Sequence, residues 1–309
     1  MHVPVLLNET LDLLVTDPDG IYIDGTLGRG GHAAEILKRL SPAGRLIGLD
    51  RDSEAIERTE EMLKPFGEQA QRLHGNFADM KTLCGQIGVT EADGILLDLG
   101  VSSPQLDVAE RGFSFCKDGP LDMRMDRSQG RSAAEWVNEE DEQILANVIY
   151  RYGEERDSRR IARAIVRARE NGRIERTLQL AEIVEKVKGG RRGPTHPATK
   201  TFQALRIAVN AELDSLERGL ETGLDMLRDG GRMAVITFHS LEDRIVKECF
   251  KRHTVKRESL QQGGERLMVD EPAVRLVNRK PLTAAKEECI ENPRSRSAKL
   301  RVAQRENAA

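Results

Sequence analysis

The stretch from Ile21 to Asp50 decides the fold of this chain, and it reads IYIDGTLGRGGHAAEILKRLSPAGRLIGLD. Two short apolar strands in it each end in an aspartate, Asp24 and Asp50, and a glycine-rich turn and a helix from Ala33 to Leu40 lie between them. Glycine lets a backbone approach a ligand closely, and a carboxylate at the tip of the second strand can hold two ribose hydroxyls. The stretch therefore predicts a binding site for an adenosyl group.

The alternation of strand and helix continues beyond this stretch. Ser53 is expected to cap a helix that runs to Leu63. Further strands are expected at residues 71–77, 94–99, 232–238, 274–277 and 298–302. Continuous apolar runs with helices between them predict an α/β fold whose mostly parallel sheet is covered on both faces.

A helical block interrupts this pattern after Gln105. Ser132 and Glu135 form a capping-box signature, and three helical segments follow that end near Gly153, Gly172 and Gly189. A single long helix is expected from residue 202 to residue 227. The sequence thus predicts a discontinuous domain at 1–105 and 199–309, with an all-helical domain at 106–198 inserted into it.

Composition places broad limits on the protein. The 309 residues are 39% hydrophobic, with no apolar run long enough to cross a bilayer and no basic-then-apolar leader, so we expect a soluble, cytoplasmic protein without a membrane partner. The four cysteines show neither C-x-x-C spacing nor a nearby histidine pair; they are Cys84, Cys116, Cys249 and Cys289. We therefore expect reduced, mostly buried thiols and no metal.

Charge is unevenly distributed along the chain. The net charge is −3, but residues 151–206 hold fifteen Lys and Arg against seven Asp and Glu, a local excess of +8. A second basic stretch follows at Arg294, Arg296, Lys299, Arg301 and Arg305. Such clusters suit a phosphate backbone. The alternative for the first cluster is a solvated helix face paired with Glu154, Glu155 and Asp157.

Two cofactor classes fit the glycine turn. The spacing Gly28-x-Gly30-x-x-Ala33 matches a dinucleotide fingerprint, so a nicotinamide-dependent oxidoreductase is one candidate. The carboxylate of Asp24 at the end of the first strand, however, suits the ammonium group of S-adenosylmethionine better than a pyrophosphate, because two anions would repel. Asp98 ends the fourth strand, so three carboxylates are expected to line one crevice. The alternative is that Asp24 and Asp98 only end strands or cap helices.

Several longer stretches of the sequence are distinctive: 24–32, 98–107, 111–115, 118–125, 152–155, 196–206 and 238–244. They resemble one known family, the bacterial small-subunit ribosomal RNA cytosine-N4 methyltransferases of the MraW type. The resemblance runs from about His2 to Arg301. It implies a class I, Rossmann-like methyltransferase fold with an inserted helical domain.

The resemblance also implies a donor, an acceptor and a partner. The donor would be S-adenosylmethionine, and the acceptor N4 of one cytidine in the decoding region of 16S rRNA, within the small ribosomal subunit. A homodimer is left open. The family's cofactor positions correspond to Gly30, Gly31, His32, Asp50, Phe77, Asp98 and Gln105. Phe77 would form an apolar wall for the adenine.

The catalytic residues are expected just after the fourth strand. Oxygens of the turn formed by Ser102, Ser103 and Pro104 are expected to bind the N–H groups of the cytosine amine and accept its proton. The turn lacks the second proline and the aromatic residue common in base amino-methyltransferases. Phe113 or Phe115 could stack on the base instead, although a core position is the commoner role for such a residue.

His239 and four basic residues complete the candidate set. His239 follows the fifth strand and could accept a proton, or could make a structural hydrogen bond to the following turn. RNA phosphates are expected to meet Arg191, Arg192, Lys200 and Arg206. Besides the oxidoreductase, the alternatives are a non-catalytic rRNA-binding assembly factor and a methyltransferase for a protein or small molecule.

Overall fold

The computed structural model describes residues 4–191, 193, 195–254, 256–259, 265–268 and 271–306. The chain divides into two compact units, and each is described by itself below. Unit 1 comprises residues 1–100 and 213–309, and unit 2 comprises residues 101–212. Among the described residues, no helix is both long and apolar enough to span a membrane.

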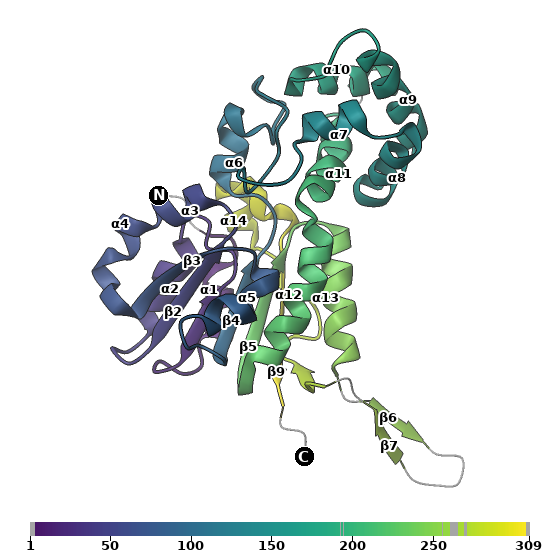
Figure 1. The fold of residues 1–309 in the computed structure, drawn as a ribbon. Coiled ribbons are helices and arrows are strands. Elements are labelled where there is room, and N and C mark those ends of the chain that lie inside the picture. Colours follow the sequence, from purple (N-terminus) through teal and green to yellow (C-terminus); the bar gives the residue numbers. More distant parts are fainter. Residues whose placement is uncertain are drawn as a thin grey trace. The chain divides into compact units, whose positions relative to one another are not determined.

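Unit 1 is built on a seven-stranded sheet with the strand order β3-β2-β1-β4-β5-β9-β8 (Figure 1). The first five of these strands run parallel, β9 runs antiparallel to β5, and β8 antiparallel to β9. Their bounds are β1 Ile21–Asp24, β2 Arg45–Asp50, β3 Ala70–His74, β4 Ala92–Asp98, β5 Leu227–Thr237, β8 Val274–Leu276 and β9 Lys299–Arg305. The α/β fold with a mostly parallel sheet is confirmed. A separate hairpin consists of β6 Lys256–Ser259 and β7 Glu265–Met268.

Helices cover both faces of this sheet. One face packs on α1 (Leu7–Leu14) and α2 (Gly31–Arg39), and the other on α5 (Met80–Gly85), α12 (Glu212–Met226) and α13 (Ser240–Arg252). The remaining helical segments of unit 1 are α3 Ser53–Arg58, α4 Glu60–Leu63, α14 Lys286–Glu291 and the 3₁₀ turns Lys64–Gln69, Phe77–Asp79 and Pro293–Ser297. The two apolar layers fix the sheet between them, so the strand ends have fixed positions.

Three sequence-based element boundaries were wrong. The helix from Ser53 is capped by Asp52 and breaks at Thr59, whose hydroxyl donates to the carbonyl of Ala55 at 3.0 Å. The third strand ends at His74. The predicted helix from 202 to 227 is two helices, because Ala211 takes a left-handed conformation with φ of 46°.

Unit 2 is helical. Its elements are α6 Ser103–Asp107, the 3₁₀ turn Ala109–Arg111, α7 Ala133–Glu139, α8 Glu142–Gly153, α9 Ser158–Arg169, α10 Thr177–Lys188 and α11 Thr199–Asn210. The capping box of Ser132 and Glu135 is confirmed at α7, but α7 and α8 occupy the place of one predicted segment. The sequence placed the insert at 106–198, whereas the compact unit extends from Val101 to Glu212 because α11 packs within it.

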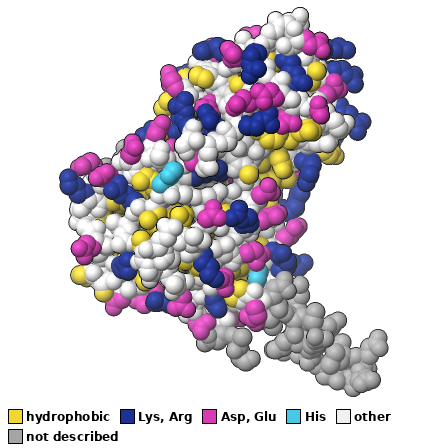
Figure 2. All heavy atoms as spheres, in the orientation of Figure 1, with side chains coloured by type: hydrophobic (Ala, Val, Ile, Leu, Met, Phe, Trp, Pro, Cys, Tyr) yellow, Lys and Arg dark blue, Asp and Glu magenta, His cyan; other side chains and the backbone are white. Residues whose placement is uncertain are grey.

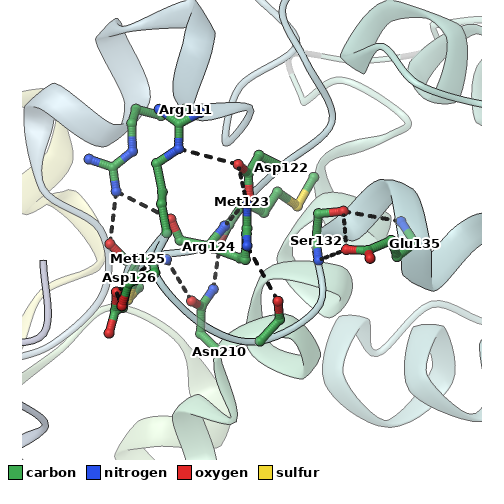
Figure 3. A network of polar contacts seen from close by, with 12 residues as sticks. Arg111, Asp122, Met123, Arg124, Met125, Asp126, Ser132, Glu135 and Asn210 are labelled. Atoms are coloured by element: carbon green, nitrogen blue, oxygen red, sulfur yellow. Dashed lines mark hydrogen bonds and ion pairs between the residues drawn. The ribbon is translucent and has the colours of Figure 1, made fainter.

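A buried polar network holds the long non-helical segment of unit 2 in place (Figure 3). Arg111 is 2% exposed, and its Nη2 donates to the carbonyls of Arg124 (3.2 Å) and Met125 (3.0 Å). The side chain of Asn210 accepts from the Met125 N–H at 2.8 Å and donates to the Met123 carbonyl at 2.7 Å. Much of the family-like sequence at 111–125 therefore serves to fix backbone, because buried peptide groups need partners.

Candidate cofactor and substrate sites

Three aspartates lie at the same edge of the unit 1 sheet. Asp24, Asp50 and Asp98 are the last residues of β1, β2 and β4, which run parallel as neighbours. Carboxyl ends of parallel strands are the usual ligand-binding edge of an open α/β sheet. The structure thus brings these three predicted residues to one edge.

The glycine turn after β1 is shaped by backbone that only glycine tolerates well. Gly28 has φ of 53° and Gly30 φ of 72°, and a Cβ on Gly30 would collide with the side chain of Met62. The Gly28 N–H donates to Asp50 Oδ2 at 2.7 Å, which ties the turn to the tip of β2. Gly30 precedes α2 and Gly31 begins it. Both predicted glycines therefore lie at the N-terminus of α2.

Thr26 links the other two aspartates and was not predicted. Its Oγ1 accepts from the Asp98 N–H at 2.6 Å, and its own N–H donates to Asp24 Oδ1 at 3.1 Å. Asp24 is 2% exposed, while the side chain of Asp98 is 27% exposed. Thr26 thus connects the ends of β1 and β4 through its hydroxyl and its backbone N–H, and no local sequence signal marks it.

These carboxyls carry unusually high pKa values. Burial raises the pKa of Asp24 to about 7, of Asp50 to about 6 and of Asp98 to about 8. The charge of Asp50 raises the pKa of Asp24 further, and the charges of Asp24 and Glu242 raise that of Asp98. Within the described ranges, their ion-pair contacts include no lysine or arginine. Among the described residues, only Asp50 is influenced by a nearby cation, Arg51, whose charge lowers its pKa; the edge is therefore a cluster of carboxyls that are held partly protonated and would ionise beside a positive ligand.

His32 contacts Asp98 as a neutral imidazole. Burial lowers the pKa of His32 to about 4. Its Nε2 lies 3.2 Å from the Val5 carbonyl, which can only accept, so the proton lies on Nε2 and the Nδ1 lone pair faces Asp98 Oδ2 at 3.5 Å. Asp98 Oδ1 is buried and has no hydrogen-bond partner among the described residues. A buried oxygen of this kind calls for a ligand donor.

Phe77 lies in the 3₁₀ turn after β3, beside the first strand's loop and α12. Phe77 packs closely on two glycines. A Cβ added to Gly25 would lie 3.0 Å from the Phe77 Cβ, and a Cβ added to Gly219 would collide with the Phe77 ring. The ring is partly buried against the core. Whether its open part forms the adenine wall remains a prediction.

The predicted catalytic turn begins unit 2. Ser102 caps α6, and Gln105 Oε1 accepts from the Ser102 N–H at 3.0 Å, which closes a capping box. Ser103 is 8% exposed and Gln105 5%. Gln105, predicted to hold cofactor, therefore fixes the turn with its amide oxygen.

His239 caps α13 at the sheet edge of unit 1. Its Nδ1 accepts from the Glu242 N–H at 3.4 Å, while Glu242 accepts from the Phe238 and His239 N–H groups. Its Nε2 lies 3.1 Å from Glu242 Oε1, but the two atoms do not form a hydrogen bond, and Nε2 is buried without a hydrogen-bond partner among the described residues. The hydrogen bond at Nδ1 is of the structural kind that the sequence offered as the alternative to proton transfer by His239. Glu242, which is 2% exposed and influences Asp98, was missed because a buried capping glutamate looks like any other in sequence.

The predicted RNA-binding residues differ in their surroundings. Lys200 is exposed and donates to the Glu154 carbonyl at 2.9 Å, and exposed Arg191 donates to the Gly193 carbonyl at 3.2 Å. Arg206 forms a two-bond ion pair with Glu212 at 2.8 and 2.7 Å and is only 15% exposed, so its contact with RNA stays a prediction. Arg192 lies outside the described residues.

Helix α9 supplies better candidates than Arg206. Arg156, just before the helix, and Arg159 and Arg167 on it are exposed and form no ion pair among the described residues. Arg160, in contrast, pairs with Asp157 at 2.9 Å. Lys and Arg side chains gather over the α8 and α9 region on the face shown in Figure 2, with acidic groups among them.

Other sequence expectations also changed. In the second basic stretch, Lys299 and Arg301 pair with Asp243 at 3.0 and 2.7 Å, so these two hold the fold together. Phe113 is a buried core residue, as its commoner role predicted, and Phe115 packs against His196 and Phe202. All four cysteines are free, with two buried; Cys116 is exposed.

The strand order, with antiparallel β9 beside β5, and the acidic edge beside a glycine turn define a class I, Rossmann-like methyltransferase fold. The model of the MraW methylase family matches residues 1–306, and the chain belongs to that family. A Geobacter sulfurreducens protein named Ribosomal RNA small subunit methyltransferase H is 51% identical over 306 residues, 98% of each chain. A Symbiobacterium thermophilum protein of the same name is 52% identical over 302 residues, 97% of this chain and 95% of its own.

Proposed function

We propose that this chain transfers a methyl group from S-adenosylmethionine to the N4 amine of one cytidine in the decoding region of 16S rRNA. The observation that carries the proposal is the acidic edge: three carboxyls with raised pKa values and no lysine or arginine paired with them among the described residues. A ligand that carries an ammonium group and a sulfonium supplies the missing positive charge. The names of the close relatives support the ribosomal substrate.

The residues of unit 1 fit this donor. Asp50 would hold the ribose hydroxyls at the tip of β2, and the turn at Gly30 and Gly31 would let the donor approach the backbone. Asp24 and Asp98 would face its positive groups, and the buried Oδ1 of Asp98 would gain a partner. Bound S-adenosylmethionine would supply an electrophilic methyl group. A nicotinamide dinucleotide would instead bring a negatively charged pyrophosphate, which would oppose the ionisation of these carboxyls.

The turn at Ser102, Ser103 and Pro104 would orient the acceptor amine. The N4 lone pair is delocalised into the cytosine ring, so the amine must be held in line and relieved of a proton. The turn follows Asp98 by four residues in the chain, and its capping box gives its oxygens fixed positions. The Nδ1 atom of His239 already accepts from the Glu242 N–H and so cannot take up a proton without losing that bond; we therefore assign the proton-accepting role to the turn.

Unit 2 would bind the RNA. Its exposed basic side chains include Arg159, Arg167, Arg191 and Lys200, and of these Arg159 and Arg167 form no ion pair among the described residues, so they can contact phosphates directly. Because the substrate is ribosomal, the protein would act in the cytoplasm. A non-catalytic assembly factor would need the same basic surface but no methyl donor.

One experiment tests the reaction and the target together. Small ribosomal subunits from cells that lack the protein are incubated with it and labelled S-adenosylmethionine, and the rRNA nucleosides are then analysed. Label on N4 of cytidine is expected, and Ser103→Ala should lower turnover more than donor affinity. Donor binding without any labelled nucleoside would favour the assembly factor, and label on protein would indicate another acceptor.

A further inference from the structure

A second cluster of ionisable side chains lies in unit 1, away from the carboxyl ends of β1, β2 and β4. It consists of Glu221 on α12, Cys249 on α13 and His253 just after α13. Cys249 and His253 are four residues apart, so they share a helix face, and each is 3% exposed. Glu221 Oε2 lies 2.9 Å from His253 Nε2, and Glu221 Oε1 lies 3.6 Å from Cys249 Sγ.

The orientation of the His253 ring is set by its other nitrogen. Nδ1 lies 3.0 Å from the Pro272 carbonyl, which can only accept, so Nδ1 carries a proton. Nε2 therefore faces the carboxylate and the thiol. Histidines that bind metals commonly donate their second ring N–H to a carbonyl in this way, because it fixes the tautomer and the ring orientation.

We propose that Glu221, Cys249 and His253 bind a zinc ion, with water as the fourth ligand. One sulfur, one nitrogen and one oxygen ligand suit Zn²⁺, and each residue offers an atom within 4.8 Å of the others. Tetrahedral zinc with ordinary bond lengths separates such atoms by roughly 3.4–3.6 Å. Cys249 Sγ already lies at this distance from Glu221 Oε1, while His253 Nε2 lies 2.9 Å from the other carboxylate oxygen, Oε2, so the carboxylate would turn to present one oxygen to the ion.

The site has a route to solvent and a structural consequence. Glu221 and Arg252 line a surface groove of about 600 Å³, through which an ion could enter. A bound ion would join α12 to α13, and through the His253 ring to the segment at Pro272. This inference concerns the stability of unit 1 and does not rest on the proposed methyl transfer.

The competing account is an ion pair without metal. Arg252 donates to Glu221 Oε1, and a doubly protonated His253 would satisfy Oε2. In that account the Cys249 thiol is only a weak donor, and zinc has no site. The two accounts differ in what they predict for Arg252: removing this cation should tighten zinc binding if the ion and the guanidinium share Glu221, whereas it should create no zinc binding if there is only an ion pair.

The test uses the full-length chain without a histidine tag. Metal content is measured after purification, Zn²⁺ binding to the metal-free protein is measured by calorimetry, and Co²⁺ is added as a spectroscopic probe. We expect one ion per chain and a thiolate-to-cobalt charge-transfer band. Cys249→Ser should abolish the band and weaken Zn²⁺ binding by at least about tenfold, since even changes to groups that orient a ligand cost about 10–100-fold.

Matched controls keep the outcome clear. Cys84→Ser changes another buried thiol of unit 1 and should leave the band and the affinity unchanged. Arg252→Gln should strengthen Zn²⁺ binding. Absence of a charge-transfer band in the wild-type protein, or equal Zn²⁺ affinity of wild type and Cys249→Ser, would overturn the proposal. The wild-type cobalt spectrum decides the matter even if a variant fails to fold.

Discussion

Asp98 and Asp243 lie in the same unit, but their surroundings shift their pKa values in opposite directions. Asp98 ends β4, while Asp243 lies in the first turn of α13, just after β5. Burial alone would raise the pKa of Asp243, but hydrogen bonds from Arg301 and Lys299 hold it below its usual value. Asp98 has no such cation among the described residues, and its pKa is raised to about 8.

The difference separates structural acids from ligand-binding ones. A buried carboxylate that the fold neutralises contributes to stability once it is paired, and breaking the pair is costly. A buried carboxyl that the fold leaves without a cation lowers stability when it ionises, so its presence calls for another explanation. In this chain we propose that the explanation is a positively charged ligand. The following predictions test whether the two kinds of acid behave differently.

The largest expected effect is the loss of donor binding in Asp98→Asn. Losing a hydrogen bond to a charged group costs about 1.5–3 kcal/mol, so the dissociation constant for S-adenosylmethionine should rise about 10–150-fold. The ligand-free protein should unfold at the same or a higher temperature, because no buried charge remains at this position. Calorimetry and thermal unfolding measure the two quantities. Asp93→Asn, at the other end of β4, should leave donor affinity unchanged; an equal loss in both variants would refute the assignment.

The next largest effect is expected in Asp243→Asn, which should lose stability and keep its affinity for the donor. Arg301, which is 12% exposed, loses its partner, so the free energy of unfolding should fall by on the order of 2 kcal/mol. Donor affinity at a temperature where the variant is folded should stay within about twofold of wild type. Urea unfolding and calorimetry check this. A selective loss of donor binding with normal stability would erase the distinction between the two acids.

The pH dependence of stability should also differ between the three carboxyls of the sheet edge and Asp243. Asp24, Asp50 and Asp98 have folded pKa values of about 6–8 against about 3.9 in an unfolded chain, so the folded state binds more protons between these values. The ligand-free protein should therefore lose stability as pH rises from about 5 to 8, by up to about 1.4 kcal/mol per unit for each group. Asp243 acts in the opposite direction and only below about pH 4.

Unfolding midpoints at pH 5.5, 6.5 and 7.5 (roughly spanning the window above), at constant ionic strength, measure this slope. The slope should flatten in Asp98→Asn and with saturating S-adenosylmethionine. A ligand-free stability that is constant or increases over this range would contradict the raised pKa values.

The smallest expected effect is on rRNA binding, and it compares unpaired with paired arginines within the described part of the chain. Arg159 and Arg167 pair with no acid among the described residues, whereas Arg206 pairs with Glu212. Arg159→Gln with Arg167→Gln should weaken rRNA binding and lower the slope of log affinity against log salt by about 1 per residue. Arg206→Gln should lower stability and leave that slope unchanged. Equal slopes in all variants would exclude α9 from the RNA surface.

The sequence predicted what lies at strand ends and missed what depends on distant partners. Apolar runs that stop at Asp24, Asp50 and Asp98 reveal both the sheet and its acidic edge, because side chains at neighbouring carboxyl ends must meet. The break at Ala211 could not be foreseen, since alanine is a strong helix former. Arg301 looked like an RNA ligand because Asp243, which neutralises it, lies 58 residues earlier.

The two candidate sites of unit 1 also differ in how far the sequence could predict them. The sheet edge follows from local patterns, but the Glu221, Cys249 and His253 cluster depends on how α12 packs beside α13. Its C-x-x-x-H spacing alone is too short a signal to predict zinc. Thr26 and Glu242 were missed because their contacts to the aspartates and to the α13 cap are not marked by any motif.

Proton release on donor binding tests the central claim most directly. At pH 6.5, chosen to lie below the roughly 7.7–8.0 of a free amino group, calorimetric titration of the protein with S-adenosylmethionine in buffers of different ionisation enthalpy gives the number of protons exchanged. Carboxyls that are protonated in the free protein and ionised beside a cation must release about one proton or more, and Asp98→Asn must release fewer. Binding without proton release, or with proton uptake, would contradict the account, and so would no binding at all.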